Sequence, residues 1–538
     1  MANNTDTSTR LDAVVVGAGF SGLYMLHRLR QEGFSVKVIE AAADVGGTWY
    51  WNRYPGARCD IPSLMYSYSF SEELQQEWEW QERYAGQPEI LRYLNHVAER
   101  FDLRRDIQFD TRVTAALFDE STNRWTLTTD SAEVFSAQFC VMATGCLSSP
   151  KPPPIDGLDS FTGDWYHTAY WPHEGVDFTG QRVGIIGTGS SSIQSIPVIA
   201  EQADHLTVFQ RTANFSVPAW NHDLGAEEVA EWKSRYAEIR RLARLGEAAA
   251  GNAMNMWAAT DITPEQQREE LERRWQMGGL AMWFPFTDVI TDDAANTIAG
   301  DFVRDKIRST VKDPATAELL CPKGYPYGTK RVCVDTDYYE TFNRDKITLI
   351  DINDSPIERI TPAGLKTQTH EYEFDALVFA TGFDAMTGTL LRMDIQVRNG
   401  AALGNKWSDG PRTYLGLMMA DFPNLFAITG PGSPSVLSNM VVSIEQHVDW
   451  VTDCMIHLRQ HALSTIEPTK DAEDQWVNHV NGLASATLLT QANSWYMGAN
   501  VPGKPRVFMP YLAGVGPYRQ VCEDVVSDGY RGFLLGGG

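Results

Sequence analysis

The apolar residues of this chain gather in short runs, and two of these runs lead into a glycine-rich turn. Residues 12–16 and 182–186 have the length and continuous apolar character of buried strands, and helical periodicity follows the first turn. Residues 34–40 form another buried run, so that residues 12–40 predict a strand–helix–strand unit. Other strand-like runs follow at 138–144, 347–350, 376–382 and 425–430.

The first turn, Gly17-x-Gly19-x-x-Gly22, has the spacing of a phosphate-binding loop. Glycines at these positions allow a tight turn and a close approach of the backbone, so the start of the following helix can face a pyrophosphate. Glu40 ends the next strand, where a carboxylate accepts hydrogen bonds from ribose hydroxyls and repels a 2′-phosphate. The unit therefore predicts an FAD site; a purely structural glycine turn is the alternative.

The second turn, Gly187-x-Gly189-x-x-Ser192, repeats this logic with a serine in place of the third glycine. Arg211 stands at the end of the following strand, in the place that Glu40 holds in the first unit. A guanidinium there can bind a 2′-phosphate in bidentate fashion, so this turn predicts an NADPH site unless Arg211 is an ordinary surface arginine. The residues assigned to the site are Gly187, Thr188, Gly189, Ser190, Ser192, Gln210, Arg211 and Thr212.

A proline-rich stretch and a helical stretch divide the chain. Residues 151–154 read Lys-Pro-Pro-Pro, which we interpret as a domain boundary. Residues 225–320 are rich in Glu, Arg and Ala, with helix starts at Thr263 and Asp313, each followed by a proline. We expect an α/β fold with two Rossmann-like dinucleotide-binding domains, for FAD and NADPH, and a helical insertion. The expected bounds are 1–150 with 385–538 for the FAD domain, 151–222 with 331–384 for the NADPH domain, and 223–330 for the insertion.

Composition and charge indicate which binding partners and which cellular compartment to expect. A chain of 538 residues needs more than one core, and its net charge of −24 argues against nucleic acid or an anionic membrane as a partner. Seven cysteines without a Cys-x-x-Cys motif indicate a reduced setting without disulfides or a zinc knuckle. The first ten residues are polar, and no apolar run is long enough to span a bilayer. We expect a cytoplasmic protein without a metal site, as a monomer or weak homo-oligomer.

Two longer motifs support a resemblance to a known family. One is Phe161-x-Gly163-x-x-x-His167-x-x-x-Trp171-Pro172, and the other is Gly46-Gly47-x-Trp49-x-x-x-x-Tyr54-Pro55-Gly56-x-x-x-Asp60. With them the chain resembles the flavin-dependent Baeyer–Villiger monooxygenases from about residue 11 to the C-terminus. The resemblance implies bound FAD, NADPH as reductant, and O₂. It also implies a ketone substrate that receives one oxygen atom, through a flavin peroxide, to give an ester or lactone.

The resemblance also implies roles for individual residues. Arg331 matches the family's catalytic arginine, and Asp60 matches its acidic partner, which orients that arginine near the flavin. Lys330 matches a second contact to the 2′-phosphate, and Trp495 matches a contact to the nicotinamide-side ribose, although a core tryptophan is the alternative. His167 is expected to be a hydrogen-bonding linker residue rather than a base. Further cofactor contacts are expected at Gly47, Thr48 and Trp49, and a substrate pocket at Cys146, Leu147, Leu437, Met440 and Phe508.

One loop of the sequence indicates the class of ketone to expect as substrate. Residues 430–440 are similar to the corresponding loop of the phenylacetone and steroid monooxygenases, which favours bulky cyclic, aryl or steroid ketones. The alternatives are a flavin monooxygenase that oxygenates sulfides or amines, and a non-catalytic flavoprotein that senses NADPH. A disulfide reductase is disfavoured because the sequence offers no close cysteine pair.

Overall fold

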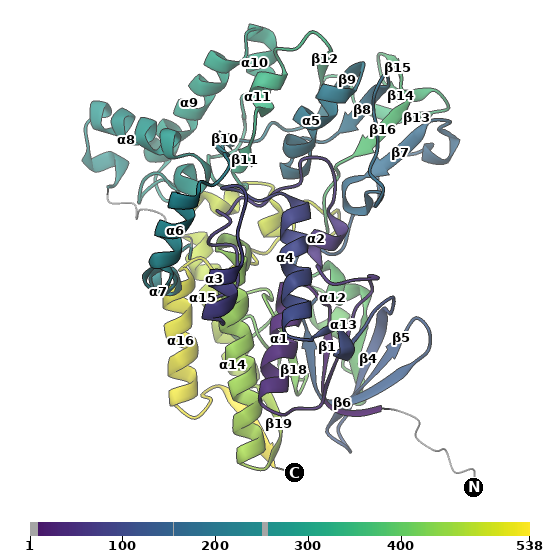
Figure 1. Ribbon diagram of the computed structural model, residues 1–538, viewed down its shortest axis with the longest axis vertical. Helices are drawn as coiled ribbons and strands as arrows, with labels where there is room; N and C mark the ends of the chain where they lie inside the picture. Colours follow the sequence, from purple (N-terminus) through teal and green to yellow (C-terminus); the bar gives the residue numbers. More distant parts are fainter. Residues whose placement is uncertain (1–8, 154, 250–256, 538) are drawn as a thin grey trace.

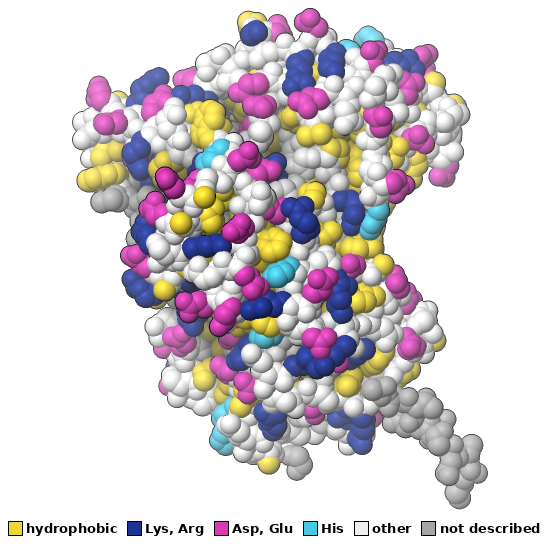
Figure 2. Space-filling view, viewed as in Figure 1, with side chains coloured by type: hydrophobic (Ala, Val, Ile, Leu, Met, Phe, Trp, Pro, Cys, Tyr) yellow, Lys and Arg dark blue, Asp and Glu magenta, His cyan; other side chains and the backbone are white. Residues whose placement is uncertain are grey.

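A mixed sheet and a parallel sheet organise the protein, one in each lobe of the view in Figure 1. The space-filling view shows the surface hollowed on one side between the two lobes (Figure 2). The computed structural model describes residues 9–153, 155–249 and 257–537. Most of the polar N-terminal stretch lies outside these residues. The α/β fold expected from the alternation of strands and helices is confirmed.

The first sheet lies in the lower lobe and contains the first glycine turn. Strand β1 runs parallel to β2 on one side and to β6 on the other, and β18 also pairs with β6. Helix α1 (Phe20–Gln31) follows β1 and lies beside the long helix α14 (Met440–Gln460; Figure 1). The predicted runs at 12–16, 34–40, 138–144 and 425–430 all supply strands here. In spatial order the sheet is β17 (Asp394–Val397), β4 (Val113–Asp119), β5 (Arg124–Thr129), β6 (Val134–Met142), β1 (Thr9–Val16), β2 (Val36–Ile39) and β3 (Ile107–Gln108), with β18 (Leu425–Ala427) at the side.

The second sheet lies in the upper lobe and is parallel throughout. Its order is β12 (Ile347–Asp351), β9 (His205–Gln210), β8 (Arg182–Ile186), β16 (Ala376–Phe379) and β7 (Asp164–His167). Helix α5 (Ser190–Gln202) starts directly after the second glycine turn. A small antiparallel sheet, which we did not predict, fills the chain between β12 and β16 with β13 (Ile357–Thr361), β14 (Gly364–Thr367) and β15 (Glu371–Glu373).

The segment around His167, expected to be a linker, contributes a strand of the second sheet. Residues 164–167 form β7, which pairs with β16 so that His167 lies opposite Phe379. Tyr166 packs against Trp171, with ring centroids 5.4 Å apart, while Trp165 on the other face is 47% exposed. A four-residue edge strand is too short for its alternating pattern to stand out in the sequence.

Two helices of the helical stretch begin where the sequence predicts. Helix α8 (Pro264–Met277) starts with a capping box between Thr263 and Gln266, and α10 (Pro314–Leu320) is capped by Asp313. Arg240 is buried and donates to the carbonyls of Leu64 and Met65, which holds the stretch against the first lobe. Its other helices are α6 (Ala226–Ser234), α7 (Tyr236–Leu245) and α9 (Asp293–Thr310).

Several remaining elements matter for the site. Strand β11 pairs with β10, and β19 pairs with β20 near the C-terminus. Among the described residues, no helix is long and apolar enough to cross a membrane, and no group of three metal-binding side chains is found. The elements are α1 (Phe20–Gln31), α2 (Thr48–Trp51), α3 (Glu72–Glu77), α4 (Gln87–Arg100), β10 (Ser216–Pro218), β11 (Cys333–Asp335), α11 (Tyr338–Thr341), α14 (Met440–Gln460), β19 (Leu463–Pro468), α15 (Lys470–Ser485), α16 (Val515–Ser527) and β20 (Phe533–Gly537).

Candidate active site

The first glycine turn is packed so closely that side chains are excluded from it. Gly17 has φ +106°, and a Cβ there would lie 2.6 Å from the carbonyl oxygen of Ala143. A Cβ on Gly22 would lie 1.8 Å from the carbonyl oxygen of Gly17. Gly19 precedes α1, whose first turn has neither a capping side chain nor an acidic residue. The N–H groups at this helix start can therefore face a phosphate, which fits a dinucleotide.

Helix α2 closes against this turn. Gly47 precedes the helix with φ +53°, and a Cβ there would lie 2.9 Å from the Cα of Gly19. Thr48 opens the helix, and Trp49 is buried, with its indole N–H donating to the Tyr66 hydroxyl at 3.2 Å. The two glycine-rich segments found in the sequence thus meet in space, with only backbone between them.

Glu40 lies at the turn, as predicted, and its carboxylate is held by the backbone. Its Oε2 accepts from the Ala18 N–H at 2.5 Å, and Oε1 accepts from the Ala42 N–H at 2.8 Å. Burial raises the pKa of Glu40, while these N–H groups counteract the rise. A carboxylate has about four acceptor sites, so two remain for ribose hydroxyls.

The second turn has the same backbone geometry as the first. Gly187 has φ +117°, and a Cβ there would lie 2.6 Å from the carbonyl oxygen of Ala380. Gly189 precedes α5, which again lacks a side-chain cap and an acidic first turn. The Thr188 hydroxyl donates to the carbonyl of Thr212 at 2.8 Å, which fixes the turn against the chain that follows β9.

The other residues assigned to this site differ in what they offer a ligand. Ser190 is exposed, with its hydroxyl 3.2 Å from the Cys333 sulfur, whereas the Ser192 hydroxyl is buried without a partner among the described residues. Gln210 is buried, and its amide donates to the Leu319 carbonyl at 2.7 Å. The Gln210 side chain therefore packs toward the helical stretch, away from an open phosphate site.

Arg211 and Lys330 lie close together beyond the end of β9. Arg211 is exposed, and Lys330 is half-buried, with its ammonium 4.6 Å from the ring centroid of Tyr325. Burial and then the charge of Arg211 lower the pKa of Lys330. Neither cation makes an ion pair with a carboxylate of the described chain. Two close cations without counter-charges favour an anion between them.

Asp60 and Arg331, 271 residues apart in the chain, form an ion pair. The Arg331 Nη2 and Nε donate to Oδ2 of Asp60 at 2.5 and 3.1 Å, and Nη1 donates to the Val436 carbonyl at 2.9 Å. The guanidinium lies 4.5 Å from the ring centroid of Trp283. The Arg331 side chain is 17% exposed and the Asp60 side chain is 30% exposed, so a small molecule can reach the pair.

The surroundings keep Arg331 charged. Burial lowers its pKa, but the charge and hydrogen bonds of Asp60, with a smaller contribution from Tyr496, raise the pKa above its usual value. Burial raises the pKa of Tyr496 to about 12, while Arg331 counteracts the rise. Arg331 is therefore a fixed cation beside the neutral phenol of Tyr496 at any working pH.

The predicted pocket residues join one apolar cluster that also contains Trp283, Tyr496 and Trp495. Phe508 and Leu437 are buried, and Leu437 follows Val436, whose carbonyl holds Arg331. Cys146, Leu147 and Met440 are half-buried at the edge of this cluster. Burial raises the pKa of the Cys146 thiol to about 11, so it stays an uncharged part of an apolar wall.

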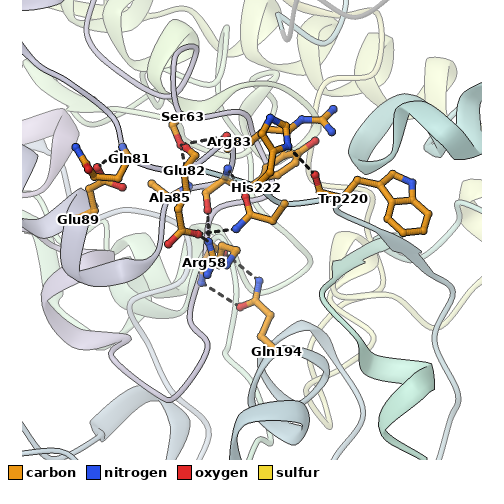
Figure 3. A network of polar contacts seen from close by, with 12 residues as sticks. Arg58, Ser63, Gln81, Glu82, Arg83, Ala85, Glu89, Gln194, Trp220 and His222 are labelled. Atoms are coloured by element: carbon orange, nitrogen blue, oxygen red, sulfur yellow. Dashed lines mark hydrogen bonds and ion pairs between the residues drawn. The ribbon is translucent and has the colours of Figure 1, made fainter. Parts of the chain in front are cut away.

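A polar network supports the loop that carries Asp60 (Figure 3). The backbone carbonyl of Arg58 accepts from the Gln194 amide of α5 at 3.0 Å. The Tyr54 hydroxyl donates to the oxygen of the same amide at 2.9 Å. The Arg58 side chain pairs with Glu82, which also accepts from Asn221. A cavity of about 150 Å³ lies beside the network, lined by Gly56, Arg58, Gln194, Val198 and Asp337 among others, and by none of the predicted pocket residues.

His167 lies away from the ion pair and has a defined tautomer. Its Nδ1 accepts from the Ala169 N–H at 3.1 Å, so in the neutral ring Nε2 carries the proton and donates to Thr381 Oγ1 at 3.0 Å. The Thr381 hydroxyl donates onward to the Lys151 carbonyl at 3.1 Å. Burial lowers the pKa of His167, which keeps this ring neutral.

Sequence reasoning missed three groups around Arg331. Trp283 comes from the helical stretch, Tyr496 adjoins the predicted Trp495, and the Val436 carbonyl is a backbone group. Of these three, only Tyr496 could have been found from the sequence, because it adjoins Trp495, which the family resemblance had singled out. A backbone acceptor leaves no signal in the sequence.

Comparison with known proteins agrees with this geometry. The model of the pyridine nucleotide-disulphide oxidoreductase family matches residues 14–233. An acetone monooxygenase (methyl acetate-forming) of Gordonia sp. is 43% identical over 98% of this chain and 100% of its own. A Baeyer–Villiger monooxygenase of Pseudooceanicola batsensis is 42% identical over 99% and 97%. A phenazine N-monooxygenase of Lysobacter antibioticus is 41% identical over 98% and 97%.

Solved structures extend the likeness to the cofactors. An oxidised steroid monooxygenase bound to NADP superimposes with a TM-score of 0.95 and 53% identity, over 98% of this chain and 100% of that one. A complex of the enzyme OTEMO with FAD and NADP gives a TM-score of 0.95 and 41% identity over the same shares. With two glycine turns fitted to dinucleotides and relatives that match along their whole length, this chain belongs to the family of flavin-dependent Baeyer–Villiger monooxygenases.

Proposed function

We propose that Arg331 and Asp60 form the reaction centre at which this FAD- and NADPH-dependent enzyme inserts one oxygen atom next to a ketone carbonyl. The observation that carries the proposal is their ion pair, which is buried enough to be fixed and open enough to meet a substrate. It faces the apolar cluster that contains all five predicted pocket residues.

FAD would be held by the first turn, through Gly17, Gly19 and Gly22, with Glu40 on its ribose. Gly47, Thr48 and Trp49 would cover it from α2. Bound FAD, once reduced by NADPH, supplies the activation of O₂ from which one oxygen atom reaches the ketone. The close backbone contacts at Gly19 and Gly47 leave no room for side chains, which supports this placement.

Arg331 would stabilise the negative charge that develops on the substrate's former carbonyl oxygen. An arginine does this without giving up a proton, because its pKa lies far above neutral and is raised further here. Asp60 would orient the guanidinium through two hydrogen bonds. Trp283 and the apolar cluster would keep water from the charge, which strengthens its effect.

NADPH would lie on the second turn, with its 2′-phosphate at Arg211 and Lys330. Thr188, Ser190, Ser192 and Thr212 would line the pyrophosphate side, and Trp495 would contact the nicotinamide-side ribose. His167 would link β7 to the backbone of Lys151 through the Thr381 hydroxyl. Gln210 would act indirectly, because its amide is bound to Leu319.

Bulky cyclic, aryl or steroid ketones are the proposed substrates. The apolar cluster beside Arg331 supports them, as does the 53% identity to the steroid monooxygenase. N-oxygenation is the second candidate, because one relative is a phenazine N-monooxygenase. A panel of these ketones with an aromatic amine, assayed by product mass, separates an ester or lactone from an N-oxide.

We further propose the domain bounds given above, since β17 and β18 return to the first sheet and β12 and β16 to the second. A cytoplasmic location is supported by the seven cysteines, all of which are free. A monomer or weak homo-oligomer is proposed as the state in solution, to be measured by light scattering.

The test of the reaction centre is Arg331→Ala. We expect NADPH still to bleach the flavin, while ester formation falls by about 10²–10³-fold. Arg359→Ala, at an exposed arginine of β13, serves as control. Ester formation at the normal rate by Arg331→Ala would refute the role of Arg331, while loss of flavin reduction would point to misfolding.

A further inference from the structure

We propose that Lys151 is a third cation of the NADPH site and contributes to the choice of NADPH over NADH. The inference rests on the proposed function of Arg211 and Lys330. Lys151 was singled out in the sequence only as the first residue of a proline-rich boundary, and no part of the reaction described above uses its side chain.

The strand order places Lys151 and Arg211 on opposite sides of the second glycine turn. Phe379 of β16 lies opposite Ile186 of β8, which in turn lies opposite Phe209 of β9. Arg211 follows β9 directly, and the Lys151 N–H donates to the Gly382 carbonyl just beyond β16 at 3.0 Å. With about 4.8 Å between neighbouring strands, β9 and β16 are about 10 Å apart. Two long side chains can reach across that gap.

This position is where a nucleotide lies on such a sheet. In an open parallel sheet, ligands bind beyond the carboxyl ends of the strands, where successive connections leave in opposite directions. Here the chain passes from β8 to β9 on one side, while β16 and β7 lie on the other. The adenosine half of a dinucleotide on the Gly187 turn would therefore lie between Arg211 and Lys151.

The Lys151 backbone is fixed on both sides. Besides the bond to Gly382, its carbonyl accepts from the Thr381 hydroxyl, which is itself bound to His167. Its ammonium donates to the Asn500 carbonyl at 2.7 Å, five residues beyond Trp495. That contact uses one of three ammonium protons and leaves two for an anion.

The charges around Lys151 leave room for an anion. Burial and then the charge of Arg211 lower the pKa of Lys151, as they do for Lys330. The nearby carboxylate is Asp384, which already forms an ion pair with Lys504 at 2.6 Å. Across the part of the chain that the structure describes, Lys151, Lys330 and Arg211 have no carboxylate within 4 Å. A phosphate dianion would relieve the repulsion among all three.

A structural role makes a different prediction. If Lys151 served only to hold Asn500 in place, its loss would weaken NADPH and NADH equally. Recognition of the 2′-phosphate instead predicts an effect confined to ligands that carry this group. The distinction can be measured without turnover.

The experiment compares Lys151→Met with the intact holoenzyme, using calorimetry with 2′,5′-ADP and with 5′-AMP. We expect 2′,5′-ADP to bind about tenfold more weakly to the variant, 5′-AMP to change less than about twofold, and the KM for NADPH to rise while that for NADH stays. The matched control is Lys504→Met, which removes a neighbouring cation that is already paired with Asp384; it should show no selective loss.

The outcomes separate this inference from the proposed NADPH site. Selective loss with both Arg211→Ala and Lys151→Met supports both. Selective loss with Arg211→Ala alone overturns the role of Lys151 and leaves the site intact. If neither variant discriminates between the two nucleotides, the NADPH site itself is wrong. Equal weakening of both nucleotides by Lys151→Met also overturns the inference, in favour of a structural role.

Discussion

The two glycine turns share one backbone geometry but differ in everything that surrounds it. At Gly17 and at Gly187 φ is strongly positive, and in both turns a Cβ would lie 2.6 Å from a carbonyl oxygen of a neighbouring strand end. Around the first turn, Glu40 is buried and held by two N–H groups. Around the second, Arg211 is exposed and has no carboxylate partner in the described chain.

The difference in packing suits the two cofactors. The first turn is closed by α2, with backbone against backbone at Gly19 and Gly47, whereas a Cβ on Gly189 would meet nothing within 4 Å. A cofactor that stays bound through many turnovers gains from a preorganised site. A reductant that must exchange after each hydride transfer needs an accessible one. We therefore expect the first turn to hold its dinucleotide through many turnovers and the second turn to exchange its dinucleotide.

The largest effect is expected from a substitution that disrupts the first turn. In Gly22→Ala the new Cβ would lie 1.8 Å from the Gly17 carbonyl oxygen, so the turn must open. We expect almost complete loss of FAD and destabilisation by about 3 kcal/mol, measured as the ratio of flavin to protein absorbance and by urea unfolding. Ser192→Gly, at the matching position of the second turn, should keep its FAD. A yellow, stable Gly22→Ala protein would contradict the packing argument.

Much of this comparison could be predicted from the sequence because it depends on local spacing. Both glycine turns, their strands, and the opposite charges of Glu40 and Arg211 follow from residues close together in the chain. The ion pair of Arg331 with Asp60 did not follow from spacing, because 271 residues separate its members and only the family resemblance joined them. The orientation of Gln210 toward Leu319 depends on packing against a distant helix and left no trace in the sequence.

A smaller effect is expected at the second turn. Arg211→Ala removes one cation from an exposed phosphate site, so the KM for NADPH should rise by about 10- to 100-fold and that for NADH much less. Steady-state kinetics with both reductants, at one salt concentration, measure the difference. An equal rise for both would show that Arg211 does not read the 2′-phosphate.

The smallest effect is expected on the pH dependence of stability, through a buried histidine of the first lobe. His447 is buried below Thr429, accepts its N–H at 2.9 Å, and has a pKa lowered by burial to about 3. A histidine with a lowered pKa stabilises the fold above its unfolded pKa of about 6.5, and this contribution is lost as the pH falls toward 3. At pH 5 the loss is about 2 kcal/mol.

The measurement is the apparent Tm between pH 7.5 and 5. His447→Asn, which keeps an acceptor near Thr429, should show a flatter decline than the unmodified protein, even if it is less stable throughout. His461→Asn, on the surface after α14, is the control. Parallel declines in all three proteins would show that His447 does not carry the acid sensitivity.

The elements that escaped prediction share a physical cause. Strand β7 and the strands β13 to β15 are three to five residues long, too short for a period-two pattern to emerge. Trp283 and Lys151 meet their partners through tertiary contacts between segments that lie far apart in the chain. Sequence patterns depend on residues that are close together in the chain, whereas these contacts join residues that are far apart in it.

We expect the ion pair between Asp60 and Arg331 to affect how efficiently the reaction uses NADPH. Asp60 belongs to a loop tied to α5 through Gln194. Arg331 lies two residues before β11, whose Cys333 sulfur is 3.2 Å from the Ser190 hydroxyl of the second turn. The ion pair therefore exists only while the two halves of the molecule stay docked. Loosening that docking should leave NADPH oxidation running while oxygen transfer to the ketone fails, so that the two electrons of NADPH would reduce O₂ to hydrogen peroxide instead. We therefore expect loss of the ion pair to lower the amount of ester formed per NADPH consumed more than it lowers the rate of NADPH oxidation.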